Sequence, residues 1–399
     1  MLDIGLAHRN EYDLEPGQPS LISIAEAPGR VHFLGEQGGS NAGLFLSAAI
    51  DRYVRVAVSA RKDNSLRFFA ADLGERKRST LINLKYKRED RWANYLKVAI
   101  QVFADLGFPV RGLNFTVLGN IPQQIALASS TAMEIAAAMA LRGFFNAQLT
   151  KQDLVNKLVN THTIMFGKAA LVVDYLIGLF ARKDQFLVVD ELSQSIVKKI
   201  KSPLSRHYQL FFIDSRVPRM GEESELDFRL ADIQKGLTLL CQKQEGASFR
   251  DFATTDLMEV MGDFPEKIRR RSMHIVQEFR RIYDAGDALE RKELAAFARI
   301  IINSHESLRD LYEVSCPEVD WLVKRAQEAD GAAAARMTGH GFGGCTYAFI
   351  RSDMQEEYKK RLEDYERIFG FRPVVYEVKL ASGSKLVSVQ ERVHADIAY

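Results

Sequence analysis

Two charged residues, Asp174 and Arg30, lie in local sequences that indicate a specific role for the charge. Asp174 interrupts the apolar run AALVVDYLIGLF at residues 169–180. Because a buried carboxylate without a partner is costly, this aspartate is paired, caps a helix, or is poised as a base. Arg30 follows a Pro-Gly turn in the sequence APGRVHFLGEQGGSNAG. A guanidinium there either lies on the surface or points into a cleft, where it can stabilise transferred phosphoryl charge.

A glycine-rich loop, GHGFGGC at residues 339–345, is a second candidate for chemistry. Four glycines so close together require a sharp turn or a close approach, and exposed N–H groups of such a loop can bind phosphate. A dinucleotide fingerprint should follow a strand and open a helix. This loop instead follows DGAAAARM, which we interpret as helical, and enters the strand-like CTYAFI. The Rossmann interpretation is therefore excluded, and a structural turn and a functional loop both remain open.

A third candidate is the loop NIPQQIALASSTAME at residues 120–134, which ends in hydroxyl side chains. Backbone amides at a helix N-terminus form an anion site, and a serine there can also ligate magnesium. The simpler alternative is an ordinary helix N-cap.

These candidates are carried by an alternating pattern of strands and helices. Apolar and β-branched runs predict strands at 21–34 and 43–60, so we expect strands to open the protein. Helical spacing predicts a helix over 91–107, alternation predicts a strand over 113–118, and helices follow at 128–147 and, as two stretches, over 150–182. Residues 185–190 and 208–214 are strand-like, and the charged segment between them places a domain boundary near residue 205.

The second half begins with a strand and continues with amphipathic helices at about 224–245, 264–286, 291–312 and 317–329 before a final strand–helix–strand. This order predicts an α+β fold with domains at 20–205 and 206–391. The basic cluster at 267–271 and 280–281 is interleaved with acids and apolar positions, which favours a solvated helix face over a nucleic-acid site.

Composition narrows the partners and the compartment. The 399 residues are 47% apolar and carry a formal charge of +2, so no global field attracts nucleic acid or membrane, and we expect neither as a partner. Three scattered cysteines form no disulfide framework or metal-type pair, which favours a cytoplasmic protein. The first fifteen residues are charged and no apolar run is long enough to cross a bilayer, so we expect no signal peptide and no transmembrane helix.

Together and in this order, the candidate features resemble the GHMP superfamily of small-molecule kinases, and within it the galactokinase family. The sequences RWANYLK (91–97), IRRRSMHIVQEFRR (268–281), SHESLRDLYEVSCPEVDWLV (304–323) and RMTGHGFGGC (336–345) also resemble that family, and the resemblance covers about residues 22–391. It implies a ribosomal-protein-S5-like N-terminal domain, a ferredoxin-like α+β C-terminal domain, and an active-site cleft between them.

The resemblance also implies residue roles. Asp174 would accept the proton of a sugar hydroxyl, and Arg30 would offset charge on the γ-phosphoryl group of ATP, with Mg²⁺ as the metal. The implied substrate-binding residues are Glu36, Gln37, Gly39 and Asp174. The implied ATP-binding residues are Gln124, Ala126, Ala128, Ser129, Ser130, Gly339 and Gly341, and Ser130 is also the implied metal ligand.

Three departures from the family pattern fall in ligand-contacting positions. Galactokinases carry Glu-His-Thr-Asp-Tyr where this chain has EQGGS at 36–40. The histidine and the aspartate absent here contact sugar hydroxyls in that family. Losing their two hydrogen bonds, of roughly 1.5–3 kcal/mol each, would weaken galactose binding by about 3–6 kcal/mol. The family's Gly-Ala-Gly-Leu-Ser-Ser-Ser becomes QIALASS at 124–130, where any position with positive φ would be strained by about 1–2 kcal/mol. His162 replaces a glutamate that helps hold magnesium, and a neutral imidazole is a poor magnesium ligand.

Two functional hypotheses follow. The first is an ATP-dependent phosphotransferase of the galactokinase type that acts on a hydroxyl of a sugar or sugar-like molecule other than plain galactose. The second is a catalytically degenerate relative that binds a sugar or a nucleotide as a sensor, or that acts as a scaffold.

Overall fold

Eight strands form the larger of two sheets in the computed structural model, which describes residues 3–13, 21–37, 43–123, 125–218, 222–253, 260–329 and 334–390. The strands are β1 (Ile22–Leu34), β2 (Leu44–Ala60), β3 (Ser65–Ala70), β4 (Glu75–Thr80), β5 (Leu113–Gly119), β6 (Gln185–Asp190), β7 (Ser195–Lys201) and β12 (Lys385–Gln390). Their order is β12-β1-β2-β5-β3-β4, and β6 pairs with β2 and with β7. Almost every residue of β1 is buried, so this strand runs through the core and can carry side chains into it.

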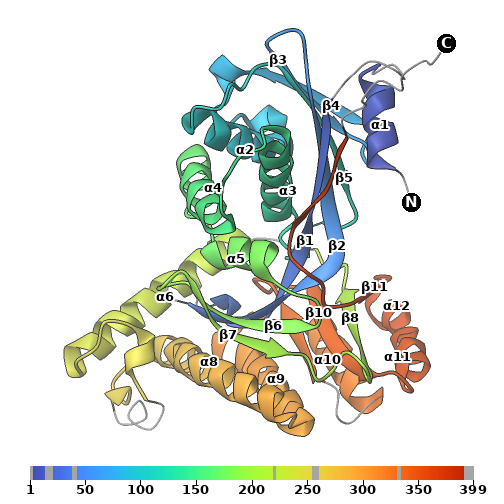
Figure 1. The fold of residues 1–399 in the computed structure, drawn as a ribbon. Helices are drawn as coiled ribbons and strands as arrows, with labels where there is room; N and C mark the ends of the chain where they lie inside the picture. The colour runs from blue at the N-terminus through green and yellow to red at the C-terminus, as the bar shows by residue number, and fades with distance from the viewer. Residues whose placement is uncertain are drawn as a thin grey trace, which may run out of the picture.

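Helices cover both faces of this sheet. The helices α2 (Ala93–Asp105), α3 (Ser129–Phe144), α4 (Lys151–Phe166) and α5 (Val172–Phe180) lie on one side, and α1 (Ile4–Glu11) lies on the other (Figure 1). The alanine-rich middle of α3 is buried, because small side chains let this helix lie close to β1 and β2. Short 3₁₀ turns lie at Leu81–Asn83 and Arg88–Asp90.

The second sheet is antiparallel, with the order β11-β8-β10-β9. Its strands are β8 (Tyr208–Asp214), β9 (Ala334–Thr338), β10 (Cys345–Arg351) and β11 (Val374–Val378). The accompanying helices are α6 (Glu222–Lys243), α8 (Glu266–Arg291), α9 (Leu294–Ser307), α10 (Pro317–Ala329), α11 (Gln355–Leu362) and α12 (Asp364–Phe369), with a 3₁₀ turn at Phe249–Asp251 and a π-helical turn at Leu308–Tyr312.

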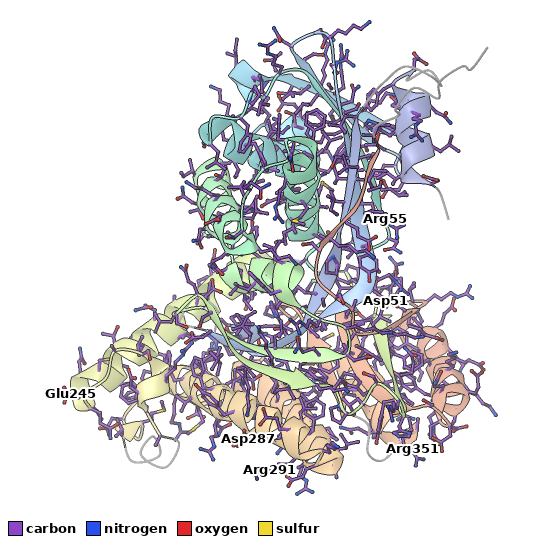
Figure 2. All side chains as sticks on the ribbon, in the orientation of Figure 1. Asp51, Arg55, Glu245, Asp287, Arg291 and Arg351 are labelled. Atoms are coloured by element: carbon purple, nitrogen blue, oxygen red, sulfur yellow. The ribbon has the colours of Figure 1, made fainter. Side chains whose placement is uncertain are left out.

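The two sheets share one apolar core. The ring of Phe33 on β1 lies 5.1 Å from that of Phe186 on β6 and 5.1 Å from that of Tyr347 on β10. The backbone connects the halves as well, since the N–H of Asp51 on β2 donates to the carbonyl of Lys379 at 3.0 Å. Asp51 and Arg55 mark this part of β2 in Figure 2. A site between the halves is therefore held by a continuous packed interior.

The structure confirms the α+β class and the sequence-predicted elements in outline, and it corrects three expectations. The run at 330–337, interpreted as helical, contains strand β9: its alanines are buried against β10, and this packing outweighs their helix propensity. The charged segment after β6 contains β7, in which Ile196 and Ile200 face inward while Lys199 and Lys201 are exposed. Strands do not open the chain, because α1 precedes β1.

Strand β12 pairs with β1, so residues 385–390 belong to the first sheet although the predicted second domain, 206–391, includes them. The boundary near residue 205 itself stays a prediction. None of the helices in the described ranges combines the length and the apolar character that crossing a membrane requires.

Candidate active site

A cavity of about 590 Å³ lies where the two halves meet. It is lined from the first half by Arg30, His32, Glu36, Gln37, Phe45, Ala126, Lys168, Leu171 and Asp174, and from the second by Leu226, Asp227, Leu230, Tyr312, Gly339 and His340. The sequence-predicted residues Arg30, Glu36, Gln37, Ala126, Asp174 and Gly339 thus come together around one space. Two other predicted residues, Gly39 and Gln124, lie outside the described residues.

Arg30 and Asp174 form a bidentate ion pair at the edge of this cavity. The guanidinium donates from Nε to Oδ1 at 2.6 Å and from Nη2 to Oδ2 at 2.9 Å. Asp174 is only 8% exposed. Burial alone would raise the pKa of the Asp174 carboxyl, but the Arg30 guanidinium and a hydrogen bond from His32 outweigh burial and hold that pKa well below its usual range. Asp174 is therefore ionised, and it is paired without being sealed off from the cavity.

His32 is a member of this cluster that the sequence analysis missed. Its Nε2 lies 3.1 Å from Oδ1 of Asp174, and its Nδ1 lies 2.6 Å from the hydroxyl of Ser47. Burial, together with the neighbouring Arg30, lowers the pKa of His32, so the imidazole is neutral. Since a carboxylate only accepts, Nε2 carries the proton and donates to Asp174. The available signal was spacing: residues 30 and 32 lie two apart on one strand and so face the same side.

Asp174 lies in the first turn of helix α5, and the N-terminus of that helix is held by Glu191. The carboxylate of Glu191 accepts from the N–H groups of Val172 and Val173 at 2.8 and 2.9 Å. These are unpaired donors of the first helical turn, so Glu191 completes the helix end that carries Asp174.

Glu36, an expected substrate contact, has its carboxylate engaged by the chain itself. Oε1 accepts from the hydroxyl of Thr338 at 2.8 Å and from the N–H of Gly339 at 2.6 Å, and Oε2 accepts from Arg336 at 2.9 Å. The neighbouring Gln37 differs: its amide nitrogen donates to the carbonyl of Gly339 at 3.1 Å, but its buried amide oxygen has no partner within the described part of the chain. Gln37 thus offers an acceptor that Glu36 does not.

The loop before α3 has the backbone that glycines would favour, although it carries alanines. Ala126 has φ 60° and Ala128 has φ 57°. Left-handed backbone costs an alanine roughly 1–2 kcal/mol, as the sequence comparison with the family's glycines predicts. Arg30 holds this loop, because its Nη1 donates to the carbonyl of Ala126 at 2.6 Å and its backbone N–H to that of Leu127 at 3.1 Å.

The glycine-rich loop joins β9 to β10, and all four of its glycines have positive φ, from 83° to 110°. A Cβ on Gly341 would lie 2.5 Å from the carbonyl oxygen of Val314, so the close approach there is to the protein's own chain. Gly339 and His340 line the cavity. The loop is therefore a structural turn at Gly341 and a cavity wall at Gly339.

A second cavity of about 480 Å³ lies on the other side of the loop before α3. Ser129 and Ser130, at the N-terminus of α3, line it together with Trp92, Tyr95, Arg88, Arg91 and Asp72, among others. Free N–H groups, hydroxyls, cations and aromatic faces in one space fit a nucleotide such as ATP.

A magnesium site has less support from protein side chains. Ser130 supplies one hydroxyl, and His162, in place of the family's glutamate, is bonded to the buried Glu134 at 2.7 Å, which also accepts from Tyr175 at 2.6 Å. Over the residues with a defined position, no three His, Cys, Asp or Glu side chains gather to hold a metal. Magnesium could bind here chiefly through phosphate oxygens and water, with Ser130 as a protein ligand.

Comparisons with known proteins match three family models. The GHMP kinases N terminal domain matches residues 94–176, the GHMP kinases C terminal domain matches 287–365, and the galactokinase galactose-binding signature matches 7–60. A Treponema pallidum protein named "Putative galactokinase" is 38% identical over 95% of this chain and 95% of its own. The chain belongs to the galactokinase family of GHMP kinases.

A further sequence relative and two solved structures are also similar to this chain. The galactokinase of Thermosipho africanus is 30% identical over 90% of this chain and 98% of its own. The Lactococcus lactis galactokinase complexed with galactose has a TM-score of 0.82 at 26% identity, covering 91% of this chain and 95% of that one. The Methanococcus jannaschii mevalonate kinase, at 17% identity and a TM-score of 0.63, shares the fold. The family and the GHMP-kinase fold inferred from the sequence are thus confirmed.

Proposed function

We propose that this galactokinase-family chain transfers a phosphoryl group from ATP to a hydroxyl of a sugar or sugar-like molecule other than plain galactose. The observation that carries the proposal is the intact pair of Arg30 and Asp174 on the wall of a cavity between the two halves. A second cavity suited to a nucleotide lies across the loop at 125–130, with residues of that loop lining both. Donor and acceptor would therefore meet at the N-terminus of α3.

Asp174 is suited to orient the attacking hydroxyl. Its Oδ2 accepts only from Arg30 among the described residues, which leaves an acceptor position for a substrate O–H. Because its pKa is held low, the carboxylate takes up the proton only late, once bond formation to phosphorus has made the hydroxyl strongly acidic. This timing suits the loose transition state of phosphoryl transfer. Arg30 keeps the carboxylate ionised and places positive charge beside the transferred group.

The proposed sugar preference rests on the polar groups around the cavity. Glu36 is bonded to Arg336, Thr338 and Gly339, so it has little capacity left for a sugar hydroxyl. Gln37 retains a buried acceptor, and Lys168 and Asp227 bring a cation and an anion to the lining. This set differs from the family's histidine and aspartate, which supports a substrate other than galactose.

The test is an ADP-release assay with MgATP and a panel of sugars, including galactose, run with the wild type and with Asp174→Asn. We expect product with at least one sugar other than galactose, and a loss of about 10²–10⁴-fold in kcat on substitution, the usual worth of general-base help. Asp287→Asn is the control, because Asp287 lies on α8, far from α5 (Figure 2), and its side chain is 52% exposed.

Two results would overturn the proposal. Product formation that survives Asp174→Asn would remove Asp174 from the chemistry. Binding of ATP or of a sugar without product from any sugar would favour the second hypothesis, a sensor or scaffold that has lost phosphoryl transfer.

A further inference from the structure

A like-charged pair lies on strands β3 and β4 of the first sheet. In the antiparallel pairing of β3 with β4, Arg67 stands directly opposite Arg78. Neighbouring side chains in such a pair are close, and like charges directly opposite each other destabilise a sheet. The pair therefore needs a counter-charge or disfavours its own strand pairing.

The chain neutralises the cations around this pair but not the pair itself. Arg61 is bonded through two nitrogens to Asp63, at 2.9 and 2.8 Å, and Arg76 is bonded through two nitrogens to Glu11, at 2.6 and 2.7 Å. Throughout the described ranges, neither the Arg67 nor the Arg78 side chain has a hydrogen bond or an ion pair. The carboxylates nearby are thus already used.

These side chains surround a cavity of about 450 Å³. Its lining consists of Arg61, Arg67, Arg76, Lys77 and Arg78 with Glu11, Tyr12 and Phe68. Four of these residues are arginines and only one is a carboxylate, although the chain as a whole carries a formal charge of only +2. Lys77 adds no free cation, because its ammonium donates to the carbonyl of Glu89 at 2.8 Å. The excess is therefore local. Glu11 and Tyr12 place the cavity on the face that carries α1, opposite α2 and α3 (Figure 1).

Two side chains in the wall of this cavity are held by contacts with the chain itself. The Tyr12 hydroxyl donates to the carbonyl of Phe115 at 2.7 Å, and the Arg76 guanidinium lies 4.9 Å from the centre of the Phe69 ring. Because Arg61 and Arg76 are already paired with carboxylates, Arg67 and Arg78 are the arginines left to bind a ligand, and a planar guanidinium binds phosphate through two parallel hydrogen bonds.

We infer that this cavity, the β3–β4 arginine site, binds a small molecule carrying two or more phosphate groups. Such an anion would bridge Arg67 and Arg78 and convert their repulsion into two charge-assisted contacts. The cavity is separate from both cavities of the proposed kinase site, so the ligand here is neither the sugar nor the ATP that reacts. The inference does not depend on the proposed function.

The experiment is calorimetric titration of the full chain with inorganic tripolyphosphate, comparing wild type with the double variant Arg67→Ser/Arg78→Ser. The matched control is Arg280→Ser/Arg367→Ser, which removes the same charge from exposed helix positions. We expect a binding event that the β3–β4 variant weakens at least tenfold and the control leaves intact. Without ligand, the β3–β4 variant should melt higher than wild type, because a repulsive pair has been removed.

Every other outcome counts against the site. Equal affinity in wild type and the β3–β4 variant would place any binding elsewhere, for example in the kinase cavities. An equal loss in the control pair would show attraction by net charge only. Binding of a single-stranded oligonucleotide without binding of tripolyphosphate would replace the small-molecule assignment with a macromolecular one. The β3–β4 variant should keep wild-type sugar-dependent ADP release, which separates failure of this site from failure of the proposed function.

Discussion

Two arginines, one on either side of the cleft, pair with carboxylates in different ways. Arg30 on β1 makes a two-pronged pair with Asp174, and a single histidine completes that cluster. Arg336 on β9 is fully buried and contacts Glu36 at 2.9 Å and Glu278 at 3.4 Å. Both clusters reach the cavity, through Asp174 and Glu36, but only the first, the open cluster, has an acceptor to spare. In the second, the closed cluster, the chain's own donors occupy the acceptors.

The closed cluster is saturated with donors. Glu278 accepts from Ser304 at 2.9 Å and from Arg281 at 2.9 Å, and Ser304 in turn accepts from Nε of Arg336 at 2.9 Å. Because Glu36 also accepts from Thr338 and Gly339, the cluster joins the end of β1 to α8, α9 and β9. Both clusters contain an arginine and a carboxylate, so residue type alone does not distinguish a structural carboxylate from a reactive one. The difference is that the reactive carboxylate has a free acceptor position directed at the cavity.

The largest expected effect comes from breaking the closed cluster. Arg336→Met leaves Glu36 without its cation and Glu278 with Arg281 alone, and breaking a buried pair in this way costs about 3–5 kcal/mol of folding free energy. Urea denaturation should show this loss, and a smaller one for Arg30→Met, because Asp174 keeps His32 and lines a cavity. Arg280→Met, at a 74% exposed position, is the control and should change stability by less than about 1 kcal/mol. A loss for Arg30→Met that equals or exceeds that of Arg336→Met would contradict the comparison.

The open cluster was predictable in part, whereas the closed one was not. Asp174 and Arg30 stand out locally, since one is a carboxylate in an apolar run and the other follows a Pro-Gly turn. Glu36 has no such local sign, because its partner Arg336 lies 300 residues away and only the fold brings them together. Strand β9 was missed for a related reason: its alanines favour a helix locally, and only packing against β10 makes them a strand.

Acidification should weaken the closed cluster over a defined range. Burial acts to raise the pKa of Glu278, but Arg336 and Arg281 outweigh it and lower that pKa from 4.5 to about 2. A carboxyl with a lowered folded-state pKa stabilises the fold above its unfolded value and loses that contribution as the pH falls through the folded value. Stability should therefore drop by about 3 kcal/mol between pH 4.5 and 2, at about 1.4 kcal/mol for each pKa unit.

Urea denaturation at stepped pH tests this prediction. Glu278→Gln should be less stable near neutrality but should lose less stability below pH 4.5, so the two curves converge. Glu245→Gln, at an exposed position just beyond α6 (Figure 2), should follow the wild-type curve. Curves for wild type and Glu278→Gln that stay parallel down to pH 2 would show that this carboxyl is not the group whose protonation destabilises the fold.

A smaller effect is expected from the histidine of the open cluster. His32→Leu removes the donor to Oδ1 of Asp174, and a hydrogen bond to a charged group is worth roughly 1.5–3 kcal/mol. If the proposed function holds, kcat should fall about 10- to 100-fold with little change in KM, because His32 acts on the substrate through Asp174. His32→Asn can retain an N–H donor and should recover much of the rate. Equal rates for the Leu and Asn variants would remove His32 as a positioning residue.

The smallest effect tests the loop that Arg30 holds. Ala128 adopts φ 57°, so Ala128→Gly relieves a strain of about 1–2 kcal/mol while adding about 0.5–1 kcal/mol of chain entropy cost. The net gain in stability should therefore lie between about 0 and 1.5 kcal/mol. Ala132→Gly, four residues later inside α3, offers no strain to relieve and should instead cost about 1 kcal/mol or more. Opposite signs at these two alanines would show that the loop keeps its left-handed turn against the preference of its own side chain. The same sign at both would mean that the loop is unstrained, and that alanine in place of the family's glycine costs no folding free energy there.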